Sequence, residues 1–171
     1  MVDIRHARTR DWESLKAIRL QALTDSPDAF CTTYEEAASY DDEVWIGRAS
    51  VDPAGGTSVS LLAFDGDVTV GMAVGVLCKD SALDVVSVFV VPDHRGTGIA
   101  QELMEIVEAW GRERGADRSV LDVEVGNEQA GAFYASLGYL PTGRRQTYPG
   151  RFSLQRVELT KSLSEGPAGG G

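Results

Sequence analysis

The sequence predicts an α/β fold, of mixed α and β character, and three observations predict it. The first is an apolar run from Val85 to Val91, whose β-branched, uncharged composition is typical of a strand buried on both faces and which ends at Pro92. The second is the glycine-rich turn that follows this run. The third is the helical spacing of apolar residues that begins at Ile99, so a strand leads through a turn into a helix.

The remaining strands are predicted from alternating or continuous apolar segments. Pro149-Gly150 separates the last two segments, and Asp65-Gly66-Asp67 joins two others in a hairpin. The predicted strands are Ile4–Ala7, Val59–Phe64, Val68–Leu77, Ser119–Val125, Tyr139–Tyr148 and Arg151–Thr160.

Helical spacing predicts four helical stretches. Capping residues and glycines set their limits, because a polar side chain satisfies the first amides and glycine permits the left-handed stop. The stretches are one capped by Thr9 and stopped by Ser26-Pro27-Asp28, one that ends near Arg48, one from Ile99 that Gly111 and Gly115 close, and one that Asn127 caps and Gly138 stops.

Length and composition limit the classes of protein. A chain of 171 residues with 43% hydrophobic residues suits one globular domain, expected over residues 1–161, and residues 162–171 are expected to be a disordered Gly/Pro tail. The net charge of −10 argues against nucleic acid or an anionic membrane as the main partner. No stretch approaches about 18 apolar residues and the N-terminus has no apolar leader, so a cytoplasmic protein is expected.

The cysteines and histidines do not indicate a metal site. Cys31 and Cys78 are far apart in the sequence, and with His6 and His94 they lack the ligand spacing of zinc sites. We therefore expect no metal and two buried or half-buried free thiols.

The turn from Arg95 to Ala100 is suited to bind a phosphate. The first amides of the following helix have no intrahelical partner, the helix dipole favours an anion, and Gly96 and Gly98 allow close approach to the backbone. Arg95 can add a bidentate contact. No lysine follows a glycine and Ala100 follows Gly98 midway through the chain, which argues against mononucleotide and dinucleotide loops. A tight connection without a ligand is the alternative.

Two segments resemble a known family. Val90-x-Pro92-x-x-Arg95-Gly96-x-Gly98-Ile99-Ala100 is similar to the acyl-CoA pyrophosphate loop of the GNAT superfamily of N-acetyltransferases. Asn127-x-x-Ala130-x-x-Phe133-Tyr134-x-x-x-Gly138-Tyr139 resembles a second element of that family and follows at the expected distance. Over residues 3–161, the resemblance implies a mixed, mostly antiparallel twisted sheet of about seven strands flanked by about four helices. It also implies acetyl-CoA as co-substrate and no metal.

The resemblance implies specific contacts with the cofactor. The pantetheine arm would pair with the backbone of Phe89, Val90 and Val91, and Asn127 would contact it too. Tyr134 would meet the sulfur and protonate the departing thiolate, for which a phenol of pKa about 10 is suitable. From the residues alone, Tyr134 packs beside Phe133 and Asn127 is a helix cap. The pyrophosphate contacts would be Arg95, Gly96, Thr97, Gly98, Ile99 and Ala100.

The general base is left open among three carboxylates. An alkyl ammonium of pKa about 10 must lose a proton before attack, commonly through water to a carboxylate. By resemblance, Asp84 on the central strand and Asp122 near Asn127 are candidates, although each is Asp where the family usually has Glu. Glu124 lies on the same strand face as Asp122 by alternation and is the third. A solvated strand carboxylate is the alternative for each.

The acceptor is expected to be the primary amine of a small molecule that attacks the thioester directly. In the resembled family the first helices wall the acceptor pocket, which implies substrate contacts for Phe30, Tyr34, Glu35 and Glu36. Core aromatics and a solvated acidic turn are the alternative. A protein N-terminus or lysine as acceptor, a non-catalytic acyl-CoA sensor, and a homodimer are left open.

Overall fold

The computed structural model describes residues 1–148 and 150–164, and its strands form a seven-stranded sheet in the order β1-β2-β3-β4-β5-β7-β6. Every neighbouring pair is antiparallel except β4 and β5, which are parallel. The predicted fold class and strand number are confirmed. Pro149 and residues 165–171 of the predicted tail lie outside the described residues. The strands are β1 Val2–His6, β2 Ser58–Asp65, β3 Val68–Leu77, β4 Ala82–Val90, β5 Arg118–Glu124, β6 Leu140–Tyr148 and β7 Arg151–Ser162.

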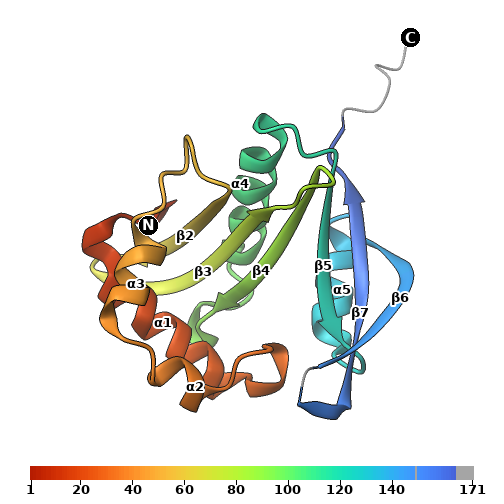
Figure 1. Ribbon diagram of the computed structural model, residues 1–171, viewed down its shortest axis with the longest axis horizontal. Coiled ribbons are helices and arrows are strands. Elements are labelled where there is room, and N and C mark those ends of the chain that lie inside the picture. The colour runs from red at the N-terminus through yellow and green to blue at the C-terminus, as the bar shows by residue number, and fades with distance from the viewer. Residues whose placement is uncertain (149, 165–171) are drawn as a thin grey trace.

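The helices cover both faces of the sheet (Figure 1). Helices α1 to α3 lie over one face of β2, β3 and β4, and α4 lies over the other face of these strands. Helix α5 lies beside β5 and β7. The bounds are α1 Trp12–Asp25, α2 Tyr34–Ala38, α3 Asp42–Ala49, α4 Ile99–Glu113 and α5 Glu128–Ser136.

Two hydrophobic cores result from this layering. Side chains of β2 alternate between them, because successive residues of a strand point to opposite faces. Leu61 and Ala63 pack in the core under α4, whereas Leu62 and Phe64 pack in the core under α1 and α3. Strands β2 and β3 are therefore covered on both sides, which explains their continuous apolar composition.

Several predicted helix limits are wrong. Thr9 does not cap α1: its Oγ1 accepts a hydrogen bond from Ser50 Oγ at 2.9 Å, and a short 3₁₀ turn precedes the helix. The predicted second stretch is two helices, α2 and α3, because Asp41 has an extended backbone between them.

Gly111 lies inside α4, where an added Cβ would be 2.8 Å from Leu83 Cδ2. It permits close packing of helix on strand, and Gly115, with φ +86°, follows the helix end.

Three further predictions need correction. The first strand begins two residues earlier than expected, at Val2. The last strand continues to Ser162, and Leu163 beyond it is buried, so the chain remains ordered past residue 161. Cys31 and Cys78 are exposed free thiols rather than buried ones, because both lie in connecting segments, Cys31 before α2 and Cys78 between β3 and β4.

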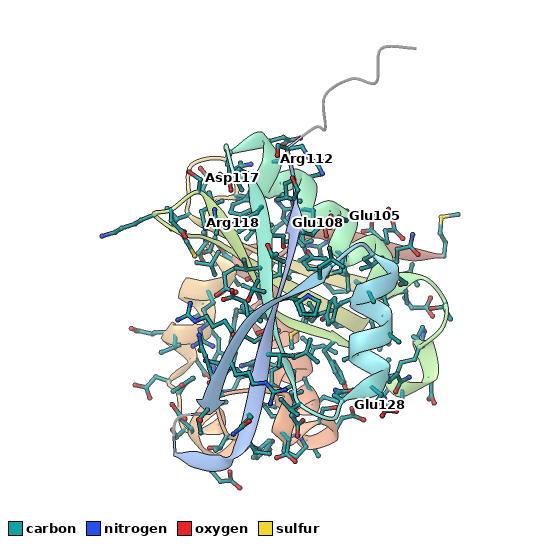
Figure 2. The ribbon with its side chains drawn as sticks, turned by 90° about the vertical axis from the view of Figure 1, so that its right-hand side faces the viewer. Glu105, Glu108, Arg112, Asp117, Arg118 and Glu128 are labelled. Carbon is teal, nitrogen blue, oxygen red and sulfur yellow. The ribbon has the colours of Figure 1, made fainter. Side chains whose placement is uncertain are left out.

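A buried polar cluster joins α4 to the C-terminal half of the sheet. Glu108 on α4 (labelled in Figure 2) is only 4% exposed. Its carboxylate accepts hydrogen bonds from Tyr139 Oη at 2.8 Å and Lys161 Nζ at 2.7 Å. Tyr139 Oη also lies 2.7 Å from Ser119 Oγ on β5. Buried charges need such partners, so the cluster fixes α4, β5 and β7 relative to one another.

Candidate active site

The sheet is split between β4 and β5. The two strands pair only where Ala82–Asp84 lies beside Arg118–Val120, and beyond that point they diverge (Figure 1). The cause lies in β4: its register with β3 shifts opposite Met72–Val74, and Ser87 has φ +58°, the geometry of a β-bulge that bends the strand. Val86 is consequently 39% exposed, so the prediction that this strand is buried on both faces is wrong at its centre.

Two adjoining cavities occupy the opening. The strand cavity, of about 490 Å³, lies between β4 and β5. The turn cavity, of about 520 Å³, lies beside the glycine-rich turn and α5. They share Val88–Val90, Asn127 and Tyr134 in their linings, so together they form one cleft with Tyr134 at the junction.

The glycine-rich turn presents unobstructed backbone to the turn cavity. Gly96 has φ +74° and Gly98, the N-cap of α4, has φ +90°, a region that favours glycine. A Cβ added at either glycine would meet nothing within 4 Å. The first intrahelical bond runs from Glu102 N to Gly98 O, so the preceding amides of α4 have no intrahelical acceptor. This geometry suits a phosphate or pyrophosphate.

Arg95 is already engaged on both sides of the turn. Its Nε donates to Val90 O at 2.9 Å and its Nη2 donates to Asp25 Oδ2 at 2.6 Å. The Ser26 hydroxyl and the Arg95 guanidinium lower the pKa of Asp25, so this ion pair persists at neutral pH. As placed, Arg95 ties the turn to β4 and α1, and the predicted bidentate phosphate contact requires its release from Asp25.

Helix α5 positions Asn127 and Tyr134: Asn127 is its N-cap and Tyr134 lies in its last turn. The Tyr134 ring packs edge-on against Phe133 and Tyr139, with ring centroids 5.1 Å and 5.8 Å apart. Burial raises the pKa of Tyr134 to about 12, so the phenol keeps its proton at neutral pH and can donate it. Asn127 Oδ1 accepts from Ala130 N at 3.1 Å, which confirms the predicted N-cap.

Asp84, Asp122 and Glu124 all line the strand cavity. Because Asp84 is in register with Val120, it shares a sheet face with Asp122. Burial, and then repulsion from Asp122, raise the pKa of Asp84. Burial raises the pKa of Asp122, against the opposing charge of Arg156, whose Nε lies 3.6 Å from Asp122 Oδ2. Burial, and then Asp28, raise the pKa of Glu124.

Of the predicted acceptor-binding residues, only Phe30 lies in the lining of the cleft. Phe30 lines the strand cavity, whereas Tyr34, Glu35 and Glu36 lie on α2 outside its lining, and Tyr34 is 44% exposed. Sequence reasoning missed Arg19, which lines the same cavity from α1. Its hydrogen-bond partner, Ser87, is 68 positions away in the sequence, so no local pattern marks it.

Two negative findings apply to the described residues. Residues 1–148 and 150–164 contain no group of three or more His, Cys, Asp or Glu side chains that could hold a metal ion. No helix in this part of the chain is long and apolar enough to cross a membrane.

The split sheet places the open N-terminus of α4, the phenol of Tyr134 and three carboxylates along one cleft. The family model described as the acetyltransferase (GNAT) family matches residues 10–139, which places the chain in the class of acyl-CoA-dependent N-acetyltransferases. The chain belongs to the GNAT acetyltransferase family, which confirms the resemblance seen in its sequence.

Individual relatives extend this comparison. The chain is 29% identical to the L-amino acid N-acetyltransferase AaaT of Escherichia coli (strain K12) over 151 residues, 85% of this chain and 86% of AaaT. Its fold is similar to that of yncA from Salmonella typhimurium, solved with its cofactor acetyl-CoA, with a TM-score of 0.77, 18% identity and coverage of 98% and 97% of the two chains. The fold is also similar to that of the PaiA N-acetyltransferase from Thermoplasma acidophilum, in complex with coenzyme A, with a TM-score of 0.73 and 16% identity. The match covers 95% of this chain and 99% of PaiA.

Proposed function

We propose that this protein transfers the acetyl group of acetyl-CoA to the primary amine of a small molecule by direct attack. The observation that carries the proposal is the cleft, which joins an open glycine turn to a carboxylate-lined cavity at Tyr134. The presence of acetyl-CoA or coenzyme A in two proteins of similar fold, and the activity named for AaaT, support it.

The residues of the turn cavity suit acetyl-CoA, which supplies an activated acetyl thioester when bound. The free amides of α4, with Gly96 and Gly98, would hold the pyrophosphate, and Thr97, Ile99 and Ala100 belong to the same turn. The backbone of Phe89 and Val90 and the side chain of Asn127 would hold the pantetheine arm, because they line the cleft where β4 has left its partner β5. Val91, the third predicted contact, lies outside both cavity linings, and its N–H donates to Val70 O at 2.9 Å.

Two side chains of the cleft would move the protons. Tyr134 Oη holds a proton at neutral pH and would give it to the departing thiolate. Asp84 would take the proton of the incoming ammonium, directly or through water. Of the three carboxylates we prefer Asp84, because it is the most deeply buried of them, so that desolvation raises its pKa, and the neighbouring Asp122 raises it further towards that of an effective base.

The experiment that tests the proposal is release of coenzyme A from acetyl-CoA in the presence of a panel of small amines and N-terminal peptides. We expect release with at least one small amine and none with the peptides. Binding of acetyl-CoA by calorimetry, without release for any acceptor, would instead establish the sensor alternative. Release with the peptides alone would identify a protein N-terminus as the acceptor.

Replacing Asp84 by asparagine is expected to lower turnover by about 10-fold to 100-fold at pH 7, with partial recovery at high pH as free amine forms unaided. Because the pKa of Asp84 is raised by folding, the native state binds its proton more tightly than the unfolded chain does. The free energy of unfolding therefore falls as the pH rises from the unfolded to the folded pKa, and the asparagine variant should be more stable at pH 7 than the parent. A base should give a lower turnover together with a higher free energy of unfolding, whereas loss of a structural carboxylate should lower the free energy of unfolding.

The matched variant is Asp122→Asn. Removing this negative charge should lower the pKa of Asp84 and move the acidic limb of the pH-rate profile to lower pH. Turnover across the pH range and thermal unfolding are the measurements. If both single variants and the double variant keep the parental profile, the base is Glu124 or solvent.

A further inference from the structure

Arg19 projects from α1 into the strand cavity. Its Nη1 donates to Ser87 Oγ at 2.8 Å, and its guanidinium lies over the Phe30 ring, 4.5 Å from the centroid. Ser87 is the residue at the β4 bulge. The guanidinium is thus held beside the point where the strands separate, by a neutral hydroxyl and an aromatic face.

This cation has no acidic partner among residues 1–148 and 150–164. Arg95 and Arg156, which also line the strand cavity, lie beside Asp25 and Asp122 respectively, but Arg19 forms no ion pair with a described carboxylate. Burial, and then the nearby Arg48, lower the pKa of Arg19 to about 10, so it remains charged at neutral pH. A half-buried cation next to a second cation is unfavourable by itself, and an anion in the cavity would relieve it.

Carboxylates line the same cavity as Arg19. Asp84, Asp122 and Glu124 contribute to its lining from β4 and β5. A ligand that complements both Arg19 and these carboxylates carries an anionic group and an ammonium group in one small molecule. The cavity volume of about 490 Å³ is within the range of small-molecule sites.

We propose that the acceptor is a free amino acid whose carboxylate binds Arg19 while its ammonium group faces Asp84 and Asp122. This inference rests on the proposed function and deepens it. Arg19 is then the residue that determines specificity for a carboxylate, and it contacts the substrate without taking part in proton transfer. A peptide N-terminus has an amide in place of the carboxylate and would leave Arg19 without its anion.

The test compares each of the common protein L-amino acids with its primary amide and its decarboxylated amine, using coenzyme A release by the wild-type protein and by Arg19→Gln. Charge-assisted hydrogen bonds contribute about 1.5–3 kcal/mol, so kcat/KM should be roughly 10-fold to 150-fold higher for the preferred acid than for its amide. Arg19→Gln should remove this preference, chiefly through KM. The loss of kcat/KM in Arg19→Gln should be much smaller for the amides and amines than for the acid. Arg19→Lys, which keeps the charge, should retain part of the preference.

The matched control is Arg48→Gln. Arg48 is an exposed arginine that lies over the rings of Tyr40 and Trp45 and is absent from the lining of the strand cavity, so the substitution removes the same charge outside it. It should keep the preference for the acid. Equal or better use of amides by the wild type, or an equal loss for all acceptors in Arg19→Gln, would overturn the inference and leave the proposed function standing. Acetyl-CoA binding without release for any acceptor would overturn both.

Discussion

Tyr134→Phe is expected to lower kcat by about 10²–10⁴-fold while the affinity for acetyl-CoA changes by less than about twofold. The phenylalanine ring keeps the edge-on packing against Phe133 and Tyr139, so the shape of the cleft junction is preserved. Only the hydroxyl proton is lost, and a proton donor acts in the transition state rather than in cofactor binding. Because burial raises the pKa of Tyr134 to about 12, the parent protein holds this proton throughout the neutral range.

The measurements are steady-state coenzyme A release and calorimetric titration with acetyl-CoA. Tyr34→Phe is the matched control, since Tyr34 is exposed on α2 and lies outside both cavity linings. It should keep the parental kcat. If Tyr134→Phe also stays within about twofold of the parental kcat, Tyr134 has a packing role only.

Gly98→Trp is expected to weaken acetyl-CoA binding by at least about 10-fold, equivalent to about 1.4 kcal/mol. A Cβ at this position would meet nothing within 4 Å, so the indole would occupy the turn cavity and cover the free amides of α4. The left-handed backbone of Gly98, at φ +90°, adds a strain of about 1–2 kcal/mol to any side chain there.

Gly143→Trp separates strain from steric exclusion. Gly143 on β6 has the same φ of +90° and the same open space around an added Cβ, but it lines neither cavity. Both variants should lose similar stability in thermal unfolding, and only Gly98→Trp should lose cofactor affinity by calorimetry. Parental affinity in a folded Gly98→Trp protein would mean that acetyl-CoA binds elsewhere.

The predictions from sequence that were confirmed depend on local chemistry. The helix that begins at Ile99 after two glycines, and the N-cap of Asn127 on Ala130, involve residues within a few positions of each other. The hairpin of β2 and β3 around Gly66 is equally local. Family resemblance added the sheet as a whole, because the two motifs belong to a known order of elements.

Tertiary packing overrode local pattern where the two disagreed. Gly111 is typical of a helix stop in sequence but lies within α4, where glycine is needed because Leu83 leaves no room for a Cβ. The second predicted helical stretch is interrupted at Asp41, and its Trp45 is buried in the core under α1. Helical spacing alone does not reveal such a break, since both pieces keep the same period.

By itself, then, the sequence determined the glycine turn at the start of α4 and the Asn127 cap of α5, because each follows from backbone conformation and hydrogen bonding between near neighbours. Its apolar patterns and family motifs indicated the fold class. Only the tertiary structure decided where β4 leaves β5, because that depends on a register shift against β3. It also decided that Arg19 meets Ser87 across 68 positions, and that Asp84 and Asp122 share one face. Charges separated in sequence acquire their effect from distance and burial, which are properties of the folded chain alone.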